Sequence, residues 1–508
     1  MQTKLSRYCE GLLEAIWLVA VAVIPLYFNV FSSRIFEPDK VTVLRTLAVT
    51  ALIAWIVLLL ESIDLQPNET IREQFTLRNL TKIPILLPVL LLALVYLISS
   101  ILSITPVTSF LGSYQRLQGT YTFVSYVVIF FALVFNLRNR EQVDRLISVI
   151  IITSLPVALY GILQRYGLDP VPWGGNVQNR IAANMGNSIF VAAYLIMVLP
   201  LTVMRIIVTF RKILLEDNQQ VATIIRSTLY IFIGILTLIA VYLSGSRGPF
   251  LGLLAGLFFL FVLLALYWQR RLLLIAVLSI AGAGALFLLI LNIPSGPLES
   301  IRDAPYVGRL GQMLDMDQRT SRVRTLIWQG AAELVLPHAP LDFPNDGSDS
   351  LNLMRPLIGY GPESMYVAYN RFYPPELAQV EKRNASPDRS HNETWDALVQ
   401  TGILGFAASQ FLYLSIFYFG LKWLGLIHTR AQRNTFLALV LGAGVITAAG
   451  LVLWQGIGFL GVGLPFGEIL GMLIYLTLFA LFRRLPEDYR RTDPERSLLL
   501  IALIAAIC

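Results

Sequence analysis

Long apolar runs constrain this chain more than any other feature of its 508 residues. Each run is about 20 residues long, the length that a helix needs to cross the hydrocarbon core of a bilayer. Apolar residues make up 56% of the chain and charged residues 14%, whereas soluble domains carry about 25% charge. A β-barrel would instead alternate apolar and polar residues over strands of about ten. The predicted fold class is therefore an all-α, polytopic transmembrane helical bundle.

Twelve uncharged or nearly uncharged runs predict about twelve membrane spans. They lie at roughly 11–31, 41–60, 83–103, 120–137, 144–163, 187–204, 227–244, 249–268, 272–293, 403–427, 435–455 and 457–482. A thirteenth run, at 497–508, is too short to span. It resembles the start of a further hydrophobic segment.

The basic residues predict which ends of these spans face the cytoplasm. With a cytoplasmic N-terminus, the inner segments hold 21 Lys and Arg residues and the short outer segments hold six. Such a bias is typical of cytoplasmic loops, and one miscounted span would destroy it. The net charge of +7 is therefore a signal of topology, and a nucleic-acid partner has no basis.

This topology divides the chain into four parts. Residues 1–293 hold about nine N-terminal spans, and residues 294–392 form a large loop on the outer side. Residues 393–482 hold the C-terminal spans, and residues 483–508 hold a basic cytoplasmic segment and the short hydrophobic run. A loop as long as the second part is usually functional or disordered. Disorder fits poorly, because the loop contains two recognisable short helices.

The first of these helices is predicted at 320–336, where apolar residues recur at helical spacing. Arg324 lies off that apolar stripe, one turn from Trp328. The second is predicted to begin at Ser390, because Ser followed three residues later by Glu is the pattern of a capping box. His391 would then be its first residue, where the helix dipole favours the neutral imidazole.

A neutral histidine at an exposed helix start is suited to act as a general base. The chain has only three histidines, which makes His391 a candidate catalytic residue. The alternative is an incidental, exposed loop histidine. His338, beside two prolines, is a weaker candidate, and His428 is weaker still.

Arginines of the predicted outer side are candidate anion ligands. Arg247 lies in the sequence Ser-Gly-Ser-Arg-Gly between two spans, where Gly245 and Gly248 permit a tight break and Pro249 suits the first helical position. An arginine among helix-terminal amides binds anions well. The alternative is an arginine that snorkels to the interface. Arg116 and Arg180 lie in neighbouring outer loops, and the group suggests a site for the head group of a lipid diphosphate.

Three other acidic features have less support. Asp315 and Asp317 form a DxD pattern, and Glu37 and Asp39 lie in the first outer loop, where many multi-span glycosyltransferases carry acidic residues. Glu468 lies near the middle of a span, and membrane-buried carboxylates are often functional. It motivates a secondary transporter as an alternative. No P-loop, H-E-x-x-H or C-x-x-C motif is present, so neither a metal nor another cofactor is predicted.

Several segments together resemble the O-antigen ligase and O-antigen polymerase superfamily. Weaker similar segments begin at Arg116 and Asn184. The stronger ones are Ser244–Gly248, Arg324–Trp328, Pro356–Pro362 and His391–Gly405. Their order, spacing and topology agree with the family over about residues 110–480. The chain departs from it at 186–188, where Gly-Asn-Ser replaces a frequent Asn-Pro-Asn.

The resemblance implies a multi-pass glycosyltransferase of the GT-C type in the cytoplasmic (inner) membrane, with its active site facing the periplasm or exterior. It implies a glycan donor linked to undecaprenyl diphosphate, a lipid A-core or other lipid or glycan acceptor, contact with membrane lipids, and metal-independent, inverting transfer. By the same resemblance, His391, Arg247 and Arg324 match the family's catalytic histidine and arginines. Arg247, Arg324, Arg116 and Arg180 would bind the diphosphate.

Two groups of alternatives remain open from the sequence. An O-antigen polymerase or a protein O-oligosaccharyltransferase would use the same donor with another acceptor. A secondary transporter, such as a bicarbonate carrier, belongs to a different class. Transporters usually show paired ionisable residues near the bilayer midplane and broken helices in corresponding halves. Neither is apparent here, and the large loop with its histidine fits an enzyme better.

Overall fold

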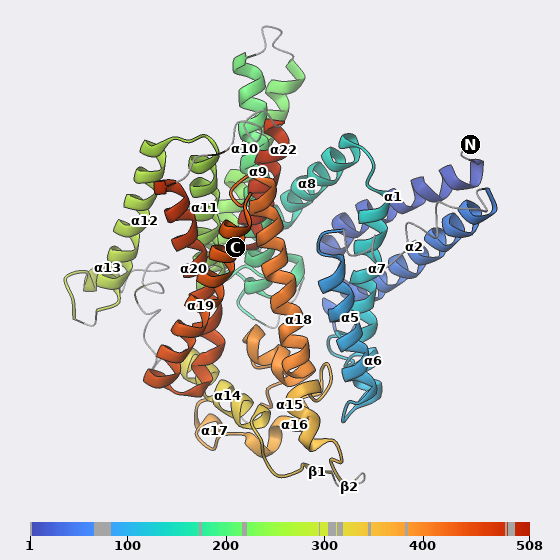
Figure 1. Ribbon diagram of the computed structural model, residues 1–508, viewed down its shortest axis with the longest axis vertical. Helices are drawn as coiled ribbons and strands as arrows, with labels where there is room; N and C mark the ends of the chain where they lie inside the picture. Colours follow the sequence, from blue (N-terminus) through green and yellow to red (C-terminus); the bar gives the residue numbers. More distant parts are fainter. Residues whose placement is uncertain are drawn as a thin grey trace. The chain divides into compact units, whose positions relative to one another are not determined.

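The fold is all-α, as the computed structural model of the chain shows (Figure 1). It describes residues 3–65, 83–171, 175–215, 221–293, 295–302, 311, 319–343, 347–381, 385–482, 485 and 493–508. Within these ranges the strands are β1 (Asp342–Phe343) and β2 (Gly347–Ser348), which pair antiparallel. The predicted fold class is confirmed.

Ten helices of the described part are long and apolar enough to cross a membrane. They are α1 (Lys4–Leu26), α2 (Glu37–Leu65), α8 (Arg140–Arg165), α9 (Ser188–Leu215), α10 (Val221–Ser244), α11 (Arg247–Tyr267), α12 (Arg271–Leu291), α18 (Glu393–Trp423), α19 (Arg430–Gln455) and α20 (Leu460–Phe482) with the preceding turn η4 (Ile457–Phe459). Two shorter apolar helices are α5 (Leu86–Ile101) and α7 (Thr120–Asn136). Each of the twelve predicted runs overlaps one of these helices, and the chain is a multi-pass membrane protein.

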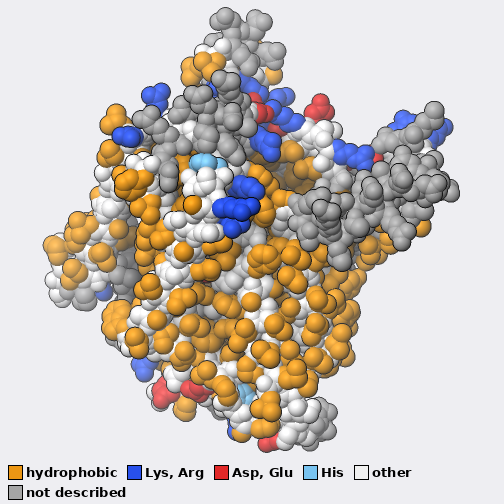
Figure 2. All heavy atoms as spheres, viewed as in Figure 1, with side chains coloured by type: hydrophobic (Ala, Val, Ile, Leu, Met, Phe, Trp, Pro, Cys, Tyr) orange, Lys and Arg blue, Asp and Glu red, His pale blue; other side chains and the backbone are white. Residues whose placement is uncertain are grey.

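The surface of the helices agrees with this assignment. Figure 2 shows hydrophobic side chains over much of the visible helical surface. Large apolar side chains such as Ile280, Ile446 and Leu453 are exposed in α12 and α19. A soluble protein rarely exposes such wide apolar areas, whereas lipid chains cover them without cost.

Shorter elements connect the spans. They are α6 (Pro106–Leu111), η1 (Ala183–Met185), α13 (Glu299–Arg302), α14 (Arg319–Val335), η2 (Asn352–Met354), α15 (Arg355–Ile358), α16 (Met365–Ala368), η3 (Tyr369–Phe372), α17 (Leu377–Val380) and α22 (Pro494–Ile507). Helix α14 confirms the helix predicted at 320–336, and its apolar stripe is buried through Ile327, Ala331 and Leu334.

The chain forms two compact units. The first comprises Met1–Glu61, Ile129–Leu314 and Leu485–Cys508, and the second comprises Ser62–Val128 and Asp315–Arg484. Each unit therefore combines segments that are distant in sequence. The four-part division by membrane topology stays a prediction.

Ion pairs gather at one end of the first unit. Arg140 of α8 pairs with Asp493, with 2.5 Å between Nη1 and Oδ2, and with Glu495. Lys212 of α9 also reaches Glu495, at 3.0 Å, and Arg145 reaches Glu14 of α1, at 2.6 Å. All these residues lie on segments that the charge bias assigns to the cytoplasmic side, except Glu14, which lies near the end of the first predicted span. The contacts therefore agree with the order of spans.

In the second unit, a glycine-rich turn lies against a break in α18. The N–H groups of Tyr360 and Gly361 donate to the carbonyl groups of Val399 and Gln400, at 2.8 and 2.9 Å. Both Gly359 (φ 73°) and Gly402 (φ 64°) adopt left-handed backbone, and a Cβ on either would lie 2.3–2.4 Å from backbone of the other segment. The two segments 356–362 and 391–405 are thus packed backbone to backbone.

A buried ion pair supports this turn. Arg355 donates from Nε and Nη2 to the two carboxylate oxygens of Asp349, at 2.7 and 2.8 Å, and from Nη1 to the carbonyl of Leu102 at 2.7 Å. Burial raises the pKa of Asp349, but the Arg355 guanidinium more than offsets this effect, and the pKa lies below its ordinary value. The pair is bidentate and nearly inaccessible to solvent.

Replacing Arg355 with methionine should destabilise the second unit by about 3–5 kcal/mol, because the Asp349 carboxylate would remain buried without its partner. Thermal unfolding of the detergent-solubilised protein measures the loss. The double substitution Arg355→Met with Asp349→Leu removes both charges and should recover part of the stability. An Arg355→Met protein as stable as the parent would contradict this account.

Candidate functional site

His391 lies in a tight turn directly before α18. The helix begins at Glu393, and its N-cap is Asn392, whose Oδ1 accepts from the backbone N–H groups of Thr394 and Trp395 at 3.1 and 3.2 Å. The predicted capping box on Ser390 is therefore wrong, and His391 is not the first helical residue. It has a left-handed backbone, with φ 57°, a conformation that only a minority of non-glycine residues adopt.

Ser390 does not cap the helix because it is hydrogen-bonded to Asp396. Its backbone N–H and its Oγ both donate to Asp396 Oδ1, each at 2.7 Å. Asp396 is buried on the first turn of α18. The carboxylate therefore fixes the backbone immediately before His391.

Distant segments of the second unit support the same turn. Trp328 of α14 donates from Nε1 to the carbonyl of Ser390 at 3.0 Å. Trp395 donates to the carbonyl of Gly458 at 2.8 Å, and Asn392 donates from Nδ2 to that of Gly461 at 3.0 Å. The turn is thus held by α14, by η4 and by the start of α20.

The charges around His391 come from three segments. Arg324 of α14 and Arg116 of the loop after α6 act on it as cations, and Asp396 and Asp388 act as anions. Arg116 Nε lies 2.7 Å from Asp388 Oδ2. The structure thus brings two of the predicted site residues, Arg324 and Arg116, within electrostatic range of a third, His391.

These surroundings favour the neutral form of His391. His391 keeps an exposed surface, and neighbouring protein atoms desolvate part of it. Desolvation by these atoms lowers the pKa of His391, the two carboxylates oppose that effect, and the two guanidinium groups lower the pKa further. The direction of the pKa change is the predicted one, and its largest cause is desolvation by burial.

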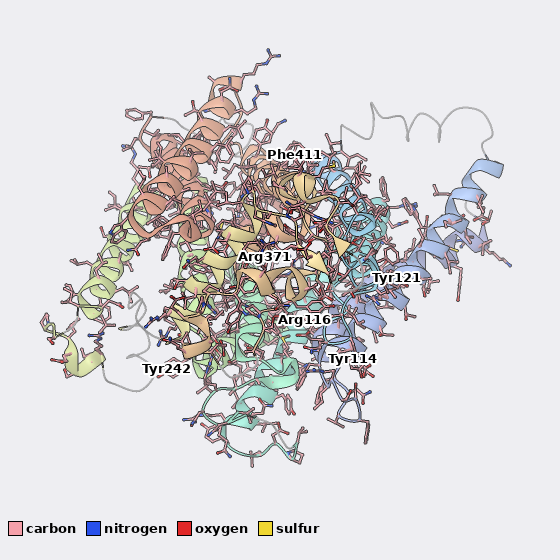
Figure 3. The ribbon with its side chains drawn as sticks, turned by 90° about the horizontal axis from the view of Figure 1, so that it is seen from below. Tyr114, Arg116, Tyr121, Tyr242, Arg371 and Phe411 are labelled. Carbon is pink, nitrogen blue, oxygen red and sulfur yellow. The ribbon has the colours of Figure 1, made fainter. Side chains whose placement is uncertain are left out.

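A buried carboxylate shapes the loop that carries Arg116. Glu363 accepts from the backbone N–H groups of Ser113 and of Gln118, the latter at 3.2 Å. Glu363 is buried and has a left-handed backbone, with φ 54°. Tyr114 and Arg116 are labelled on this loop in Figure 3, with Tyr121 at the start of α7. Glu363 and Asp388 together position Arg116.

Sequence reasoning missed the carboxylates that position the site. Glu363 carries no local signal, because its partners precede it by about 250 residues in sequence. Asp388 and Asp396 flank His391 closely, and acidic residues on both sides of a histidine were a usable signal.

Arg247 and Arg180 belong to the first unit. Arg247 is the first residue of α11, so this helix begins two residues before the predicted first position at Pro249. Gly245 has φ 56°, which confirms the predicted tight break. The side chain of Arg180 lies against this motif, because its Nε donates to the carbonyl of Ser244 and its Nη2 to Ser246 Oγ, each at 3.2 Å.

The contacts of His338, a weaker candidate from the sequence, indicate a structural role. His338 Nε2 lies 2.7 Å from the hydroxyl of Tyr360, and its Nδ1 lies 2.7 Å from the carbonyl of Ala339, so this ring braces the glycine-rich turn.

The acidic candidates lie at other places in the fold. Asp39 accepts a hydrogen bond from Asn29 at 2.7 Å. Glu37 is the first residue of α2. Glu468 faces Gly444 where α20 packs on α19. Asp315 and Asp317 lie outside the described residues.

Comparison with known families bears on the same residues. Residues 232–341 match the family model described as O-antigen ligase. The matched segment includes Arg247 and Arg324 and ends before His391. No curated protein matches the chain. Through this segment, and with the all-α membrane fold described above, the chain is similar to the O-antigen ligase family.

Proposed function

We propose that this protein is a glycosyltransferase of the O-antigen ligase type. It would transfer a glycan from undecaprenyl diphosphate to a hydroxyl of a lipid A-core or another acceptor at the outer face of the cytoplasmic membrane. The observation that carries the proposal is a histidine with a lowered pKa beside two arginines, in a turn held by three other segments. The O-antigen ligase match supports the class of reaction.

In this mechanism, His391 removes the proton of the acceptor hydroxyl as its oxygen forms a bond to the anomeric carbon. The bond between that carbon and the diphosphate oxygen breaks, and the diphosphate leaves with the electron pair. Attack from the opposite face inverts the anomeric configuration. Arg324 and Arg116 stabilise the charge that develops on the leaving diphosphate, because guanidinium groups bind phosphate oxygens in bidentate fashion.

Arg247 and Arg180 are proposed as further ligands of the donor diphosphate. Arg247 begins α11, and the positive end of a helix dipole favours anions. Arg180 is anchored on the same motif by its two hydrogen bonds.

The pH dependence of transfer tests the base assignment through two opposite changes. Cations beside His391 disfavour the imidazolium, so Arg116→Gln should raise its pKa and move the acid limb of kcat/KM to higher pH. Asp388→Asn removes an anion and frees the Arg116 charge, so it should move the same limb to lower pH. The limb reports the free enzyme's essential base. Shifts in the same direction, or none, would contradict a titrating His391.

A reconstituted reaction tests the function itself. Purified protein in liposomes receives undecaprenyl-diphosphate glycan with lipid A-core, glycan or peptide acceptors, and mass spectrometry identifies the product. A product with one acceptor class decides among ligase, polymerase and protein O-oligosaccharyltransferase. Absence of transfer to every acceptor, with uptake of bicarbonate by the same liposomes, would replace the proposal by the transporter.

A further inference from the structure

Helix α6 buries a polar side chain and exposes apolar ones. Its Ser109 is fully buried, donates from Oγ to the carbonyl of Pro362 at 2.8 Å and lies 2.7 Å from Ser103 Oγ. By contrast, Val107 is 73% exposed, and Phe110 and Leu111 are also exposed. A helix at a water-facing surface usually buries its apolar stripe and exposes its polar one. The exposed face of α6 therefore suits an apolar medium.

The length of α5 indicates where α6 lies along the membrane normal. The 16 residues of α5 extend about 24 Å at 1.5 Å per residue, less than the hydrocarbon thickness of about 30 Å. Its exposed face, with Leu94 and Ile98, continues to Ile101, which is 74% exposed. No charged residue occurs in 83–115. The lipid-facing surface of α5 thus continues onto α6.

A second exposed apolar segment lies beside the end of α5. Arg355, the first residue of α15, donates to the carbonyl of Leu102 at 2.7 Å and so ties α15 to this end. Next to it, Leu353 is 94% exposed, and Met354 and Leu357 are also exposed. We name this surface the interfacial patch. It consists of Ile101, Val107, Phe110, Leu111, Leu353, Met354 and Leu357.

We propose that the interfacial patch inserts into the lipid leaflet on the side of the large loop. The partner is the lipid itself, at the level of the head groups and upper acyl chains. Continuity with the spanning surface of α5, the absence of charge from residues 83–115 and the buried polar face of α6 support lipid over a water-exposed role. Burying apolar surface contributes about 25 cal/mol per Å², so seven exposed side chains supply a strong attachment.

The attachment has a consequence for the site, which rests on the proposed function. The loop with Arg116 follows α6 directly, and Glu363 fixes it to the segment after the glycine-rich turn. Insertion of α6 would therefore hold Arg116 at the height where a membrane lipid carries its diphosphate. The donor would reach Arg116 from within the leaflet.

Spin labelling measures the insertion without any assay of transfer. Cys9 and Cys508 are replaced by serine, and single cysteines at Val107 and, as a control, at the exposed Ser386 carry nitroxides in liposomes. The Val107 label should be accessible to oxygen and shielded from a water-soluble nickel complex, whereas the Ser386 label should be accessible to the nickel complex. Equal nickel accessibility at both positions would overturn the proposal. A Val107 label shielded from both reagents would indicate a protein partner and overturn it too.

A second measurement connects the patch with the donor. Val107→Asp should raise KM for the lipid-linked donor several-fold with kcat nearly unchanged, and Val107→Leu should leave both as in the parent. If the nitroxide at position 107 reports insertion but Val107→Asp leaves KM unchanged, the patch does insert into lipid but does not affect donor binding. If no variant or parent transfers glycan, the proposed function fails, and the labelling still decides the insertion.

Discussion

Replacement of His391 by alanine is expected to lower the rate of glycan transfer by about 10²–10⁴-fold, the usual contribution of a general base. The amount of protein in the membrane should stay the same, because the turn is held by Ser390, Asn392 and Trp328 rather than by the imidazole. Initial rates in the reconstituted reaction, normalised to protein, measure the effect.

The left-handed backbone of His391 offers a matched control. Asparagine tolerates φ near 57° better than alanine does, so His391→Asn preserves the turn while it removes the base. It should be as inactive as His391→Ala. His428→Ala, at an exposed histidine distant in sequence, should keep normal activity. If His391→Ala transferred glycan at the parent rate, the base would have to be another group.

Replacement of Arg247 by alanine is expected to lower the transfer rate by about 10²–10³-fold, as removal of one charge-stabilising donor typically does. Arg247→Lys keeps the charge but loses the planar fork, so an intermediate rate is expected. Rates at saturating donor separate this loss from weaker binding.

Arg34 provides the comparison for this experiment. It is an exposed arginine of the first predicted outer loop, and Arg34→Ala should have little effect. Equal and near-normal rates for Arg34→Ala and Arg247→Ala would assign Arg247 to the membrane interface as a snorkelling residue. The donor would then depend on other arginines.

The spans were predictable because the bilayer leaves few choices. A backbone within hydrocarbon must satisfy its hydrogen bonds internally, so every apolar run of sufficient length had to become a helix. Helix starts were less predictable. Ser390 has the expected pattern with Glu393, but Asp396 takes both of its donors, and α18 starts on Asn392 instead.

The candidate site was also only partly predictable from the sequence. Residue types and spacing indicated His391, Arg116 and Arg324 one by one, but not that the two arginines act on the charge of His391. Their grouping depends on long-range contacts, such as Trp328 with Ser390 and Glu363 with Ser113. The role of Gly359 and Gly402 also depends on a backbone contact between distant segments, which no local pattern encodes.

The small hairpin of β1 and β2 offers a practical handle on this protein. Its base is closed by the hydrogen bond from the Asp349 N–H to the carbonyl of Leu341, at 2.8 Å. Gly347 beyond this closure is exposed, with open space around the position of a Cβ. An epitope inserted there should leave the fold below the closure intact. Antibody binding to cells with a permeabilised outer envelope and an intact cytoplasmic membrane would then report which compartment the large loop faces.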